Sequence, residues 1–77
     1  MRITYDPEVD ALYIALREGV ADDSMDVEDG VTVDLDAGGH ILGVEVLDAR
    51  RRGVGLDSFV VEQLRAGRDE HAVAAAR

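Results

Sequence analysis

Apolar and polar residues alternate along several short stretches of the chain, a period of two that is typical of half-buried β-strands. Residues 2–6 and 11–17 both alternate in this way, and Pro7, the only proline, lies between them. Proline suits a turn better than a strand interior. The pattern therefore predicts a hairpin over residues 2–17. In this register apolar side chains share one face: Ile3 with Ile14 and Tyr5 with Leu12.

The strongest alternation runs over residues 31–49 and is interrupted only by Gly38-Gly39. Two adjacent glycines supply the positive φ angles of a type I′ turn, so we predict a second hairpin with a two-residue turn at this position. Its apolar pairs are Val31 with Val46, Val33 with Val44, and Leu35 with Leu42. Within the acidic loop 22–29, Met25 and Val27 alternate and indicate a further short strand.

The stretch DLDAGGHILGVE, residues 34–45, also matches much of the calcium-binding loop of an EF-hand, with acids at positions 1, 3 and 12 and glycine at 6. However, Gly38 brings no ligand at position 5, and both flanks alternate like strands rather than helices. We therefore favour the hairpin. Three side chains are the candidates for a weak surface cation site: Asp34, Asp36 and Glu45.

The C-terminal third has a different pattern, in which apolar residues recur at helical offsets. The residues are Leu56, Phe59, Val60 and Leu64. With Asp57 or Ser58 as a cap and Gly67 as a stop, this pattern predicts an α-helix over about residues 57–66. The predicted fold is α+β, an antiparallel sheet of four or five strands packed with this helix. It forms a single domain over residues 1–67, followed by a helical or disordered tail, 68–77.

The 77-residue chain has a net charge of −9, and its first 49 residues hold 13 acids against two arginines. Such a body repels phosphate backbones, so we expect no nucleic-acid partner. It can instead attract a basic protein. The absence of cysteine removes disulfides and thiolate chemistry. Since no stretch approaches the roughly 20 apolar residues of a membrane span, and the N-terminus lacks the apolar run of a signal peptide, we expect a cytoplasmic protein.

The sequence contains few residues suited to catalysis. His40 beside Asp36 could act as a general base, and with Asp34 and Glu45 it outlines a small metal-dependent hydrolase as an alternative function. No nucleophile or oxyanion donor occurs at a usable spacing, so we expect no enzyme, no catalytic residue and no cofactor. The run Arg50–Arg52 is interpreted as a solvated connector or as a partner for the acidic loop.

The predicted apolar face is larger than one helix can cover, because ten helical residues extend only about 15 Å. Uncovered apolar surface usually marks association. We therefore predict a homodimer, or a monomer that completes its core with a partner protein. The interface candidates are Tyr5, Tyr13, Ile41 and Leu47.

Three motifs, YDPEVDALYI (residues 5–14), VDLD (33–36) and ILGVEVLDA (41–49), together resemble a small bacterial family, domain of unknown function 2283. The resemblance covers about residues 2–66 and implies a small β-sheet with a C-terminal helix. Some family members are encoded beside small toxin-like proteins. The leading hypothesis is thus an antitoxin-like protein-interaction module that binds a basic protein through an acidic sheet surface. A self-associating structural domain is the second alternative.

Overall fold

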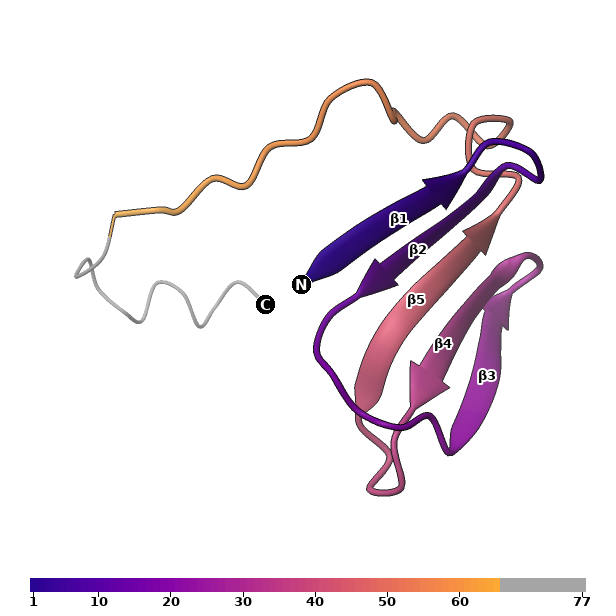
Figure 1. Ribbon diagram of the computed structural model, residues 1–77, viewed down its shortest axis with the longest axis vertical. Helices are drawn as coiled ribbons and strands as arrows, with labels where there is room; N and C mark the ends of the chain where they lie inside the picture. The colour runs from indigo at the N-terminus through magenta and orange to yellow at the C-terminus, as the bar shows by residue number, and fades with distance from the viewer. Residues whose placement is uncertain (66–77) are drawn as a thin grey trace.

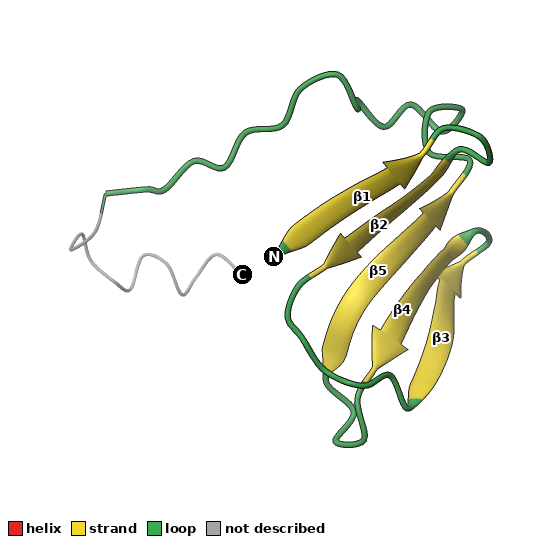
Figure 2. Ribbon diagram, in the orientation of Figure 1, coloured by secondary structure: helices red, strands yellow, loops and turns green. Residues whose placement is uncertain are grey.

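The computed structural model describes residues 1–65, and their regular secondary structure is one antiparallel sheet (Figure 1). The sheet has five strands in the order β1-β2-β5-β4-β3. Their bounds are β1 Arg2–Asp6, β2 Ala11–Ala15, β3 Asp23–Glu28, β4 Val31–Leu35 and β5 Ile41–Leu47. Residues 1–65 contain no helix, as Figure 2 shows, and hence none long and apolar enough to cross a membrane.

The order of the strands is a Greek key with one additional edge strand. Strands β3, β4 and β5 follow one another through hairpins, and β5 then lies beside β2, which leaves β1 and β3 at the edges. The crossover from β2 to β3 passes the ends of β5 and β4 (Figure 1). Two backbone hydrogen bonds of 2.8 Å fix it: Leu16 N–H donates to the Leu42 carbonyl, and Asp22 N–H to the Leu35 carbonyl.

Both predicted hairpins are confirmed. In the first, Ile3 pairs with Ile14 and Tyr5 with Leu12. In the second, Val31 pairs with Val46 and Val33 with Val44. The short strand expected around Met25 and Val27 is β3, which pairs with β4 through a register shift between Asp26 and Glu28.

The turn of the second hairpin differs from the prediction. Leu35 pairs with Ile41 rather than with Leu42, which makes Leu42 the extra residue of a bulge. Within the turn only Gly39 has a positive φ, of 84°. Its N–H donates to the Asp36 carbonyl and the Asp36 N–H to the His40 carbonyl, both at 2.9 Å, so the loop has three residues and not two. The Asp36 carboxylate favours this wider loop because it accepts the N–H groups of Gly38 and His40, each at 2.9 Å.

The helix predicted over 57–66 is wrong for residues 57–65, which have no regular structure. We call residues 54–65 the strap; they run as a long irregular segment away from the end of β5 (Figure 1). Val54 and Leu56 are half-buried, but four apolar side chains further along the strap are between 66% and 79% exposed: Phe59, Val60, Val61 and Leu64. A ten-residue helix is unstable in water without tertiary packing, and two adjacent β-branched valines weaken it further. Residue 66, the end of the predicted domain and the tail 68–77 lie outside the described residues.

The core is thin, with only Leu12, Val33, Leu42 and Ala49 buried among the described apolar residues. The paired registers place apolar side chains of four strands on one side of the sheet, which we call the apolar face: Ile3, Tyr5, Leu12, Ile14, Val31, Val33, Val44 and Val46. The other side, the mixed face, carries polar and apolar residues together: Arg2, Thr4, Asp6, Ala11, Tyr13, Ala15, Ser24, Asp26, Thr32, Asp34, Gly43, Glu45 and Leu47.

Candidate interaction surfaces

The mixed face gathers carboxylates from three neighbouring strands. Asp26 of β3 pairs with Thr32 of β4, and Thr32 pairs in turn with Glu45 of β5. Asp34 lies one pair further along β4, on the same side of the sheet. The Thr32 hydroxyl donates to Asp26 Oδ1 at 3.0 Å, which holds one of these carboxylates in place. The face therefore presents an ordered acidic surface rather than a run of loop acids.

Tyr13 crosses this face from β2 to β4. Its hydroxyl donates to Asp34 Oδ2 at 2.8 Å, and the contact is partly buried. The intervening residue of β5 is Gly43, where an added Cβ would lie 2.6 Å from the Tyr13 Cζ. The glycine thus leaves room for the ring. The hydrogen bond to Asp34, followed by burial, raises the pKa of Tyr13 above its usual value of 10.0.

Strand β3 forms an acidic edge beside this face. All six of its residues are exposed. They include Asp23, Asp26 and Glu28, and the outer side of the strand has no neighbour in the sheet. Charged residues on an edge strand discourage pairing with another copy of the same edge.

The arginines of the basic run 50–52 contact other residues of the same chain. The Arg52 guanidinium donates to Glu28 Oε2 at 3.0 Å, to the Leu47 carbonyl at 2.7 Å and to the Asp29 carbonyl. Arg52 therefore ties the end of β5 to the turn between β3 and β4. The interpretation as a partner of the acidic loop is confirmed for Arg52, whereas the side chains of Arg50 and Arg51 lie beside Asp57 and Asp48. The neighbouring Arg50 lies 5.6 Å over the Tyr5 ring, a cation–π distance.

Asp10 joins the first hairpin to the end of β5, and the sequence analysis missed it. Its carboxylate accepts the Tyr5 hydroxyl at 2.7 Å, the Arg50 N–H at 2.8 Å and the Arg51 N–H at 3.3 Å. The bonds from the Arg50 N–H and the Tyr5 hydroxyl lower the pKa of Asp10. Its own carbonyl accepts the N–H of Ala49, which is fully buried. The only sequence signal was its place at the end of a turn, where Asp tolerates the observed φ of 55°.

The residues of the alternative hydrolase do not converge. Asp34 is engaged by Tyr13, whereas Asp36 is engaged by the turn amides, whose hydrogen bonds lower its pKa, the bond from the His40 N–H most of all. The His40 Nδ1 lies 3.5 Å from Asp36 Oδ1, but its side chain is 70% exposed. Among residues 1–65, no group of three His, Asp or Glu side chains is arranged to hold a metal ion. The candidate cation ligands thus have separate roles within the sheet and its turn.

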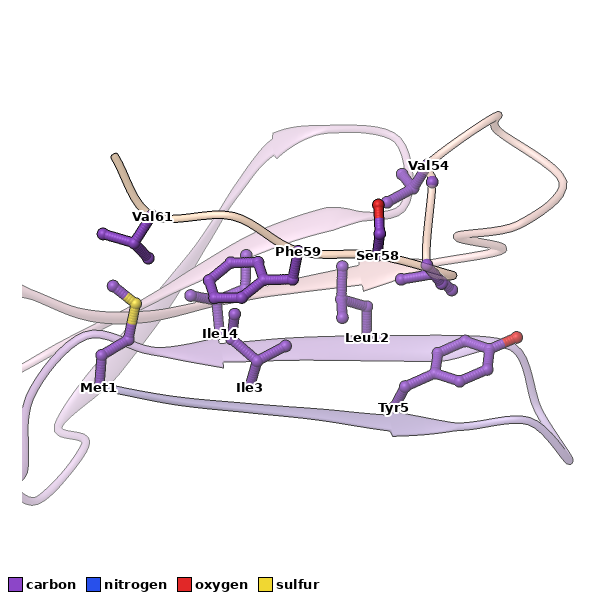
Figure 3. Close-up of a pocket in the computed structure, with 11 residues that line it drawn as sticks. Met1, Ile3, Tyr5, Leu12, Ile14, Val54, Ser58, Phe59 and Val61 are labelled. Carbon is purple, nitrogen blue, oxygen red and sulfur yellow. The ribbon is translucent and has the colours of Figure 1, made fainter. Parts of the chain in front are cut away.

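The apolar face and the strap together line a groove of about 770 Å³ (Figure 3). Ile3, Tyr5 and Ile14 form its floor, and Phe59 and Val61 of the strap lie across from them (Figure 3). Of the four predicted interface residues, only Tyr5 lines this groove. Tyr13 and Leu47 lie on the opposite face, while Ile41, 43% exposed, lies beyond the bulge.

A family model described as "Protein of unknown function (DUF2283)" matches residues 2–50. The chain belongs to this family. No curated protein and no solved structure matches it. The DUF2283 match contains all five strands and ends before the strap, short of the residues 2–66 expected from the resemblance. Two residues within the motifs of this DUF2283 chain, Asp10 and Ala49, meet at the tie between the first hairpin and β5.

Proposed function

We propose that the protein is an interaction module that binds a basic protein partner through its mixed face and the β3 edge. The observation that carries the proposal is the alignment of Asp26, Asp34 and Glu45 on one face of three adjacent strands. These three strands contain no lysine or arginine. The acidic side chains are therefore not neutralised by a basic residue of their own strands.

Electrostatics support a protein partner of opposite charge. The chain carries −9 overall, and the described arginines 50–52 contact acids or carbonyls of the chain itself. A surface of one sign steers an oppositely charged partner and accelerates encounter, an effect that salt screens over about 8–10 Å at ordinary ionic strength. Binding should therefore weaken steadily as salt is added.

The exposed edge adds a second mode of contact. The outer backbone groups of β3 have no strand beside them in the sheet. An extended basic segment can pair with such an edge through main-chain hydrogen bonds while its arginines or lysines meet Asp23 or Asp26. An antitoxin-like module would act in this way, by covering a basic surface that its partner needs for its own activity.

The test uses a basic partner captured by the tagged full-length chain from native cells at low salt, then purified. Its affinity is measured by calorimetry against the wild type and against a double variant, Asp26→Asn with Glu45→Gln. These replacements keep the shape of each side chain and the acceptor for Thr32. With each exposed pair contributing about 0.5–1 kcal/mol, we expect a loss of about 5- to 30-fold.

The matched control is Glu8→Gln with Asp48→Asn, which removes the same two charges from turns that are not part of the mixed face. We expect it to change affinity less than twofold. Equal losses in the two double variants, or an affinity that does not respond to salt, would show that net charge or another surface accounts for binding, and the proposal would be wrong.

A further inference from the structure

Strand β1 is the second edge of the sheet, and the bonding of its neighbours shows which of its backbone groups point outward. The Leu16 N–H donates to the carbonyl of Leu42, the residue opposite it. Hydrogen-bonded and non-hydrogen-bonded pairs alternate along two antiparallel strands, so every second residue of β2 bonds to β5. The residues between them, Tyr13 and Ala15, therefore direct their N–H and C=O groups toward β1.

The same alternation continues into β1. Arg2 and Thr4 are the partners of those two residues, so their backbone groups bond to β2. The backbone groups of Ile3 and Tyr5 point away from the sheet, and within residues 1–65 no backbone hydrogen bond from a turn or loop reaches them. Strand β1 thus offers two N–H donors and two carbonyl acceptors along a free edge.

The charges of the two edge strands differ. Strand β3 carries only acids, namely Asp23, Asp26 and Glu28. Strand β1 carries Arg2 at one end and Asp6 at the other, on the same side of the sheet because they are four residues apart. Arg2 is the only basic residue of the five strands, and it forms none of the ion pairs found among residues 1–65. Strand β3 therefore repels a copy of itself, whereas an antiparallel copy of β1 presents the opposite charge at each end.

An antiparallel pair of β1 strands centred on Thr4 uses all of these groups at once. Tyr5 of the second copy then lies opposite Ile3, and every such pair exchanges two N–H···O bonds, which satisfies each outward backbone group of both residues. Asp6 of the second copy lies opposite Arg2, in a non-hydrogen-bonded pair, where side chains approach most closely. A shift by two residues would place Thr4 against Arg2 or against Asp6. A shift by one would put apolar side chains on the mixed face.

Pairing through β1 also keeps the acidic strands of the two copies far apart. The two β3 edges become the outermost strands of one sheet, about 43 Å apart at a spacing of about 4.8 Å per strand. The two β5 strands, which carry Glu45, lie about 24 Å apart. Both separations exceed the screening length of about 8–10 Å at ordinary ionic strength. The net charge of −9 is therefore compatible with a contact at this edge.

We infer that two copies of the chain pair through their β1 edges, antiparallel and centred on Thr4, so that Arg2 of each copy meets Asp6 of the other in one continuous sheet. The β3 edges and the carboxylates of β3, β4 and β5 lie away from this contact. The dimer consequently presents the acidic surface twice. Because the two surfaces are separate, this inference and the proposed function can be tested independently.

The first test is the mass of the full-length chain, measured by sedimentation equilibrium over a range of concentrations. A contact between two five-residue edges is much smaller than a standard interface, so we expect a weak dimer that dissociates on dilution. At a chain concentration of about 1 mM the dimer should be the main species. A mass that stays at 8.3 kDa at this concentration would overturn the inference.

Asp6→Asn then tests the ion pair. It keeps the shape of the side chain and the oxygen that accepts the Glu8 N–H at 2.9 Å, and it removes one negative charge. Each dimer loses two ion pairs, so the dissociation constant should rise at least about threefold. The matched control is Asp23→Asn on the β3 edge, which changes the net charge equally and should leave the dimer unchanged. A dissociation constant that Asp6→Asn does not raise, or that both variants raise equally, would contradict the proposed contact.

An exchange of charges separates the ion pair from net charge. Arg2→Asp and Asp6→Arg each place like charges opposite one another in the dimer, and each alone should weaken it. The double variant restores the pair with the charges exchanged and returns the net charge to −9. It should dimerise more tightly than either single variant, and circular dichroism reports whether the strands are retained in all three. If the affinity instead followed net charge, Asp6→Arg would dimerise most tightly, and the inference would be wrong.

A further measurement needs no variant. Amide hydrogen exchange is followed by nuclear magnetic resonance at a low and a high chain concentration. The Ile3 and Tyr5 N–H groups should exchange slowly only when the chain is dimeric, whereas the Thr4 N–H, which bonds to β2, should be protected at both concentrations. Exchange rates of Ile3 and Tyr5 that do not depend on concentration would exclude the β1 edge as the contact, even in a chain that dimerises.

Discussion

The two faces of the sheet use the same strands but are held together by different interactions. On the apolar face, contacts such as Ile3 with Ile14 and Val33 with Val44 are non-directional, and the face remains partly open. On the mixed face, Tyr13 reaches Asp34 across Gly43 at a defined distance of 2.8 Å. The first kind of surface is completed by any apolar layer of suitable shape, whereas the second is already ordered within one chain.

This contrast assigns different roles to residues that alternate along one strand. In β2, Leu12 is buried on one side, while Tyr13 on the other side fixes an acidic residue. Period-two alternation thus lets a small domain carry an apolar surface and a charged surface on a single layer. If so, substitutions on the two faces should differ in size and in kind.

The largest effect is expected on the apolar face, for Leu12→Ala. Leu12 is 5% exposed, and truncating a buried leucine costs about 2–5 kcal/mol in lost burial and cavity formation. Leu47→Ala on the mixed face, 42% exposed, should cost less than half as much. Urea denaturation at one fixed chain concentration measures both, because self-association would make stability depend on concentration. Equal losses would mean that the faces are not distinct.

Gly43→Ala should have the next largest effect on stability. The new methyl group would lie 2.6 Å from the Tyr13 Cζ and 3.0 Å from the Ile14 carbonyl, and overpacking of this kind costs about 1–3 kcal/mol. Gly55→Ala is the control, since nothing lies within 4 Å of its added Cβ. If the overlap with Tyr13 is the cause, the cost of Gly43→Ala should fall when Tyr13→Ala is already present. Full additivity would contradict this account.

Tyr13→Phe tests the single hydrogen bond of the mixed face. Removing the hydroxyl should cost about 0.5–1.5 kcal/mol, near the lower limit because the contact is only partly buried. Thermal denaturation followed by circular dichroism measures the loss. In an Asp34→Ala background the same substitution should have almost no effect. An unchanged loss of stability there would show that the Tyr13 hydroxyl does not stabilise the protein through its contact with Asp34.

The smallest expected effect is a loss of stability at alkaline pH. Hydrogen bonds to Asp10 and Asp34 raise the pKa values of Tyr5 and Tyr13 above 10.0, so the folded protein holds these protons more tightly than the unfolded chain does. The stabilisation is complete below pH 10 and is lost as pH rises through the raised values. Urea midpoints measured from pH 9 upward should decline, and less steeply in Tyr13→Phe. An unaltered slope in that variant would exclude Tyr13 as a source.

The alternation along the chain was sufficient to predict the two hairpins, because burial of one face fixes a register in which every second residue is apolar. It did not predict the order β1-β2-β5-β4-β3, which depends on how the hairpins pair with each other. It also missed the Asp10 tie. Asp10 and Arg50 are 40 residues apart, and no local pattern indicates that the Arg50 N–H donates to the Asp10 carboxylate.

Two local predictions were wrong for related reasons. The pair Gly38-Gly39 fits a type I′ turn, but the Asp36 carboxylate stabilises a longer loop with one positive φ at Gly39. The offsets of Phe59, Val60 and Leu64 fit a helix, but a short amphipathic helix forms only against a surface that receives it. In the turn, a side-chain contact outside the glycine pattern decided between two conformations that the pattern allows.

By itself, the sequence determined the strands, the pairing of the first hairpin and of the part of the second hairpin away from its turn, the separation of apolar from acidic residues and the membership in DUF2283. These properties follow from period two and from the chemistry of each residue. Only the tertiary structure decided that β5 lies between β2 and β4, that Asp34 meets Tyr13, and that Arg52 binds Glu28. Such contacts depend on the free energy of bringing distant segments together, which no single stretch of the chain contains.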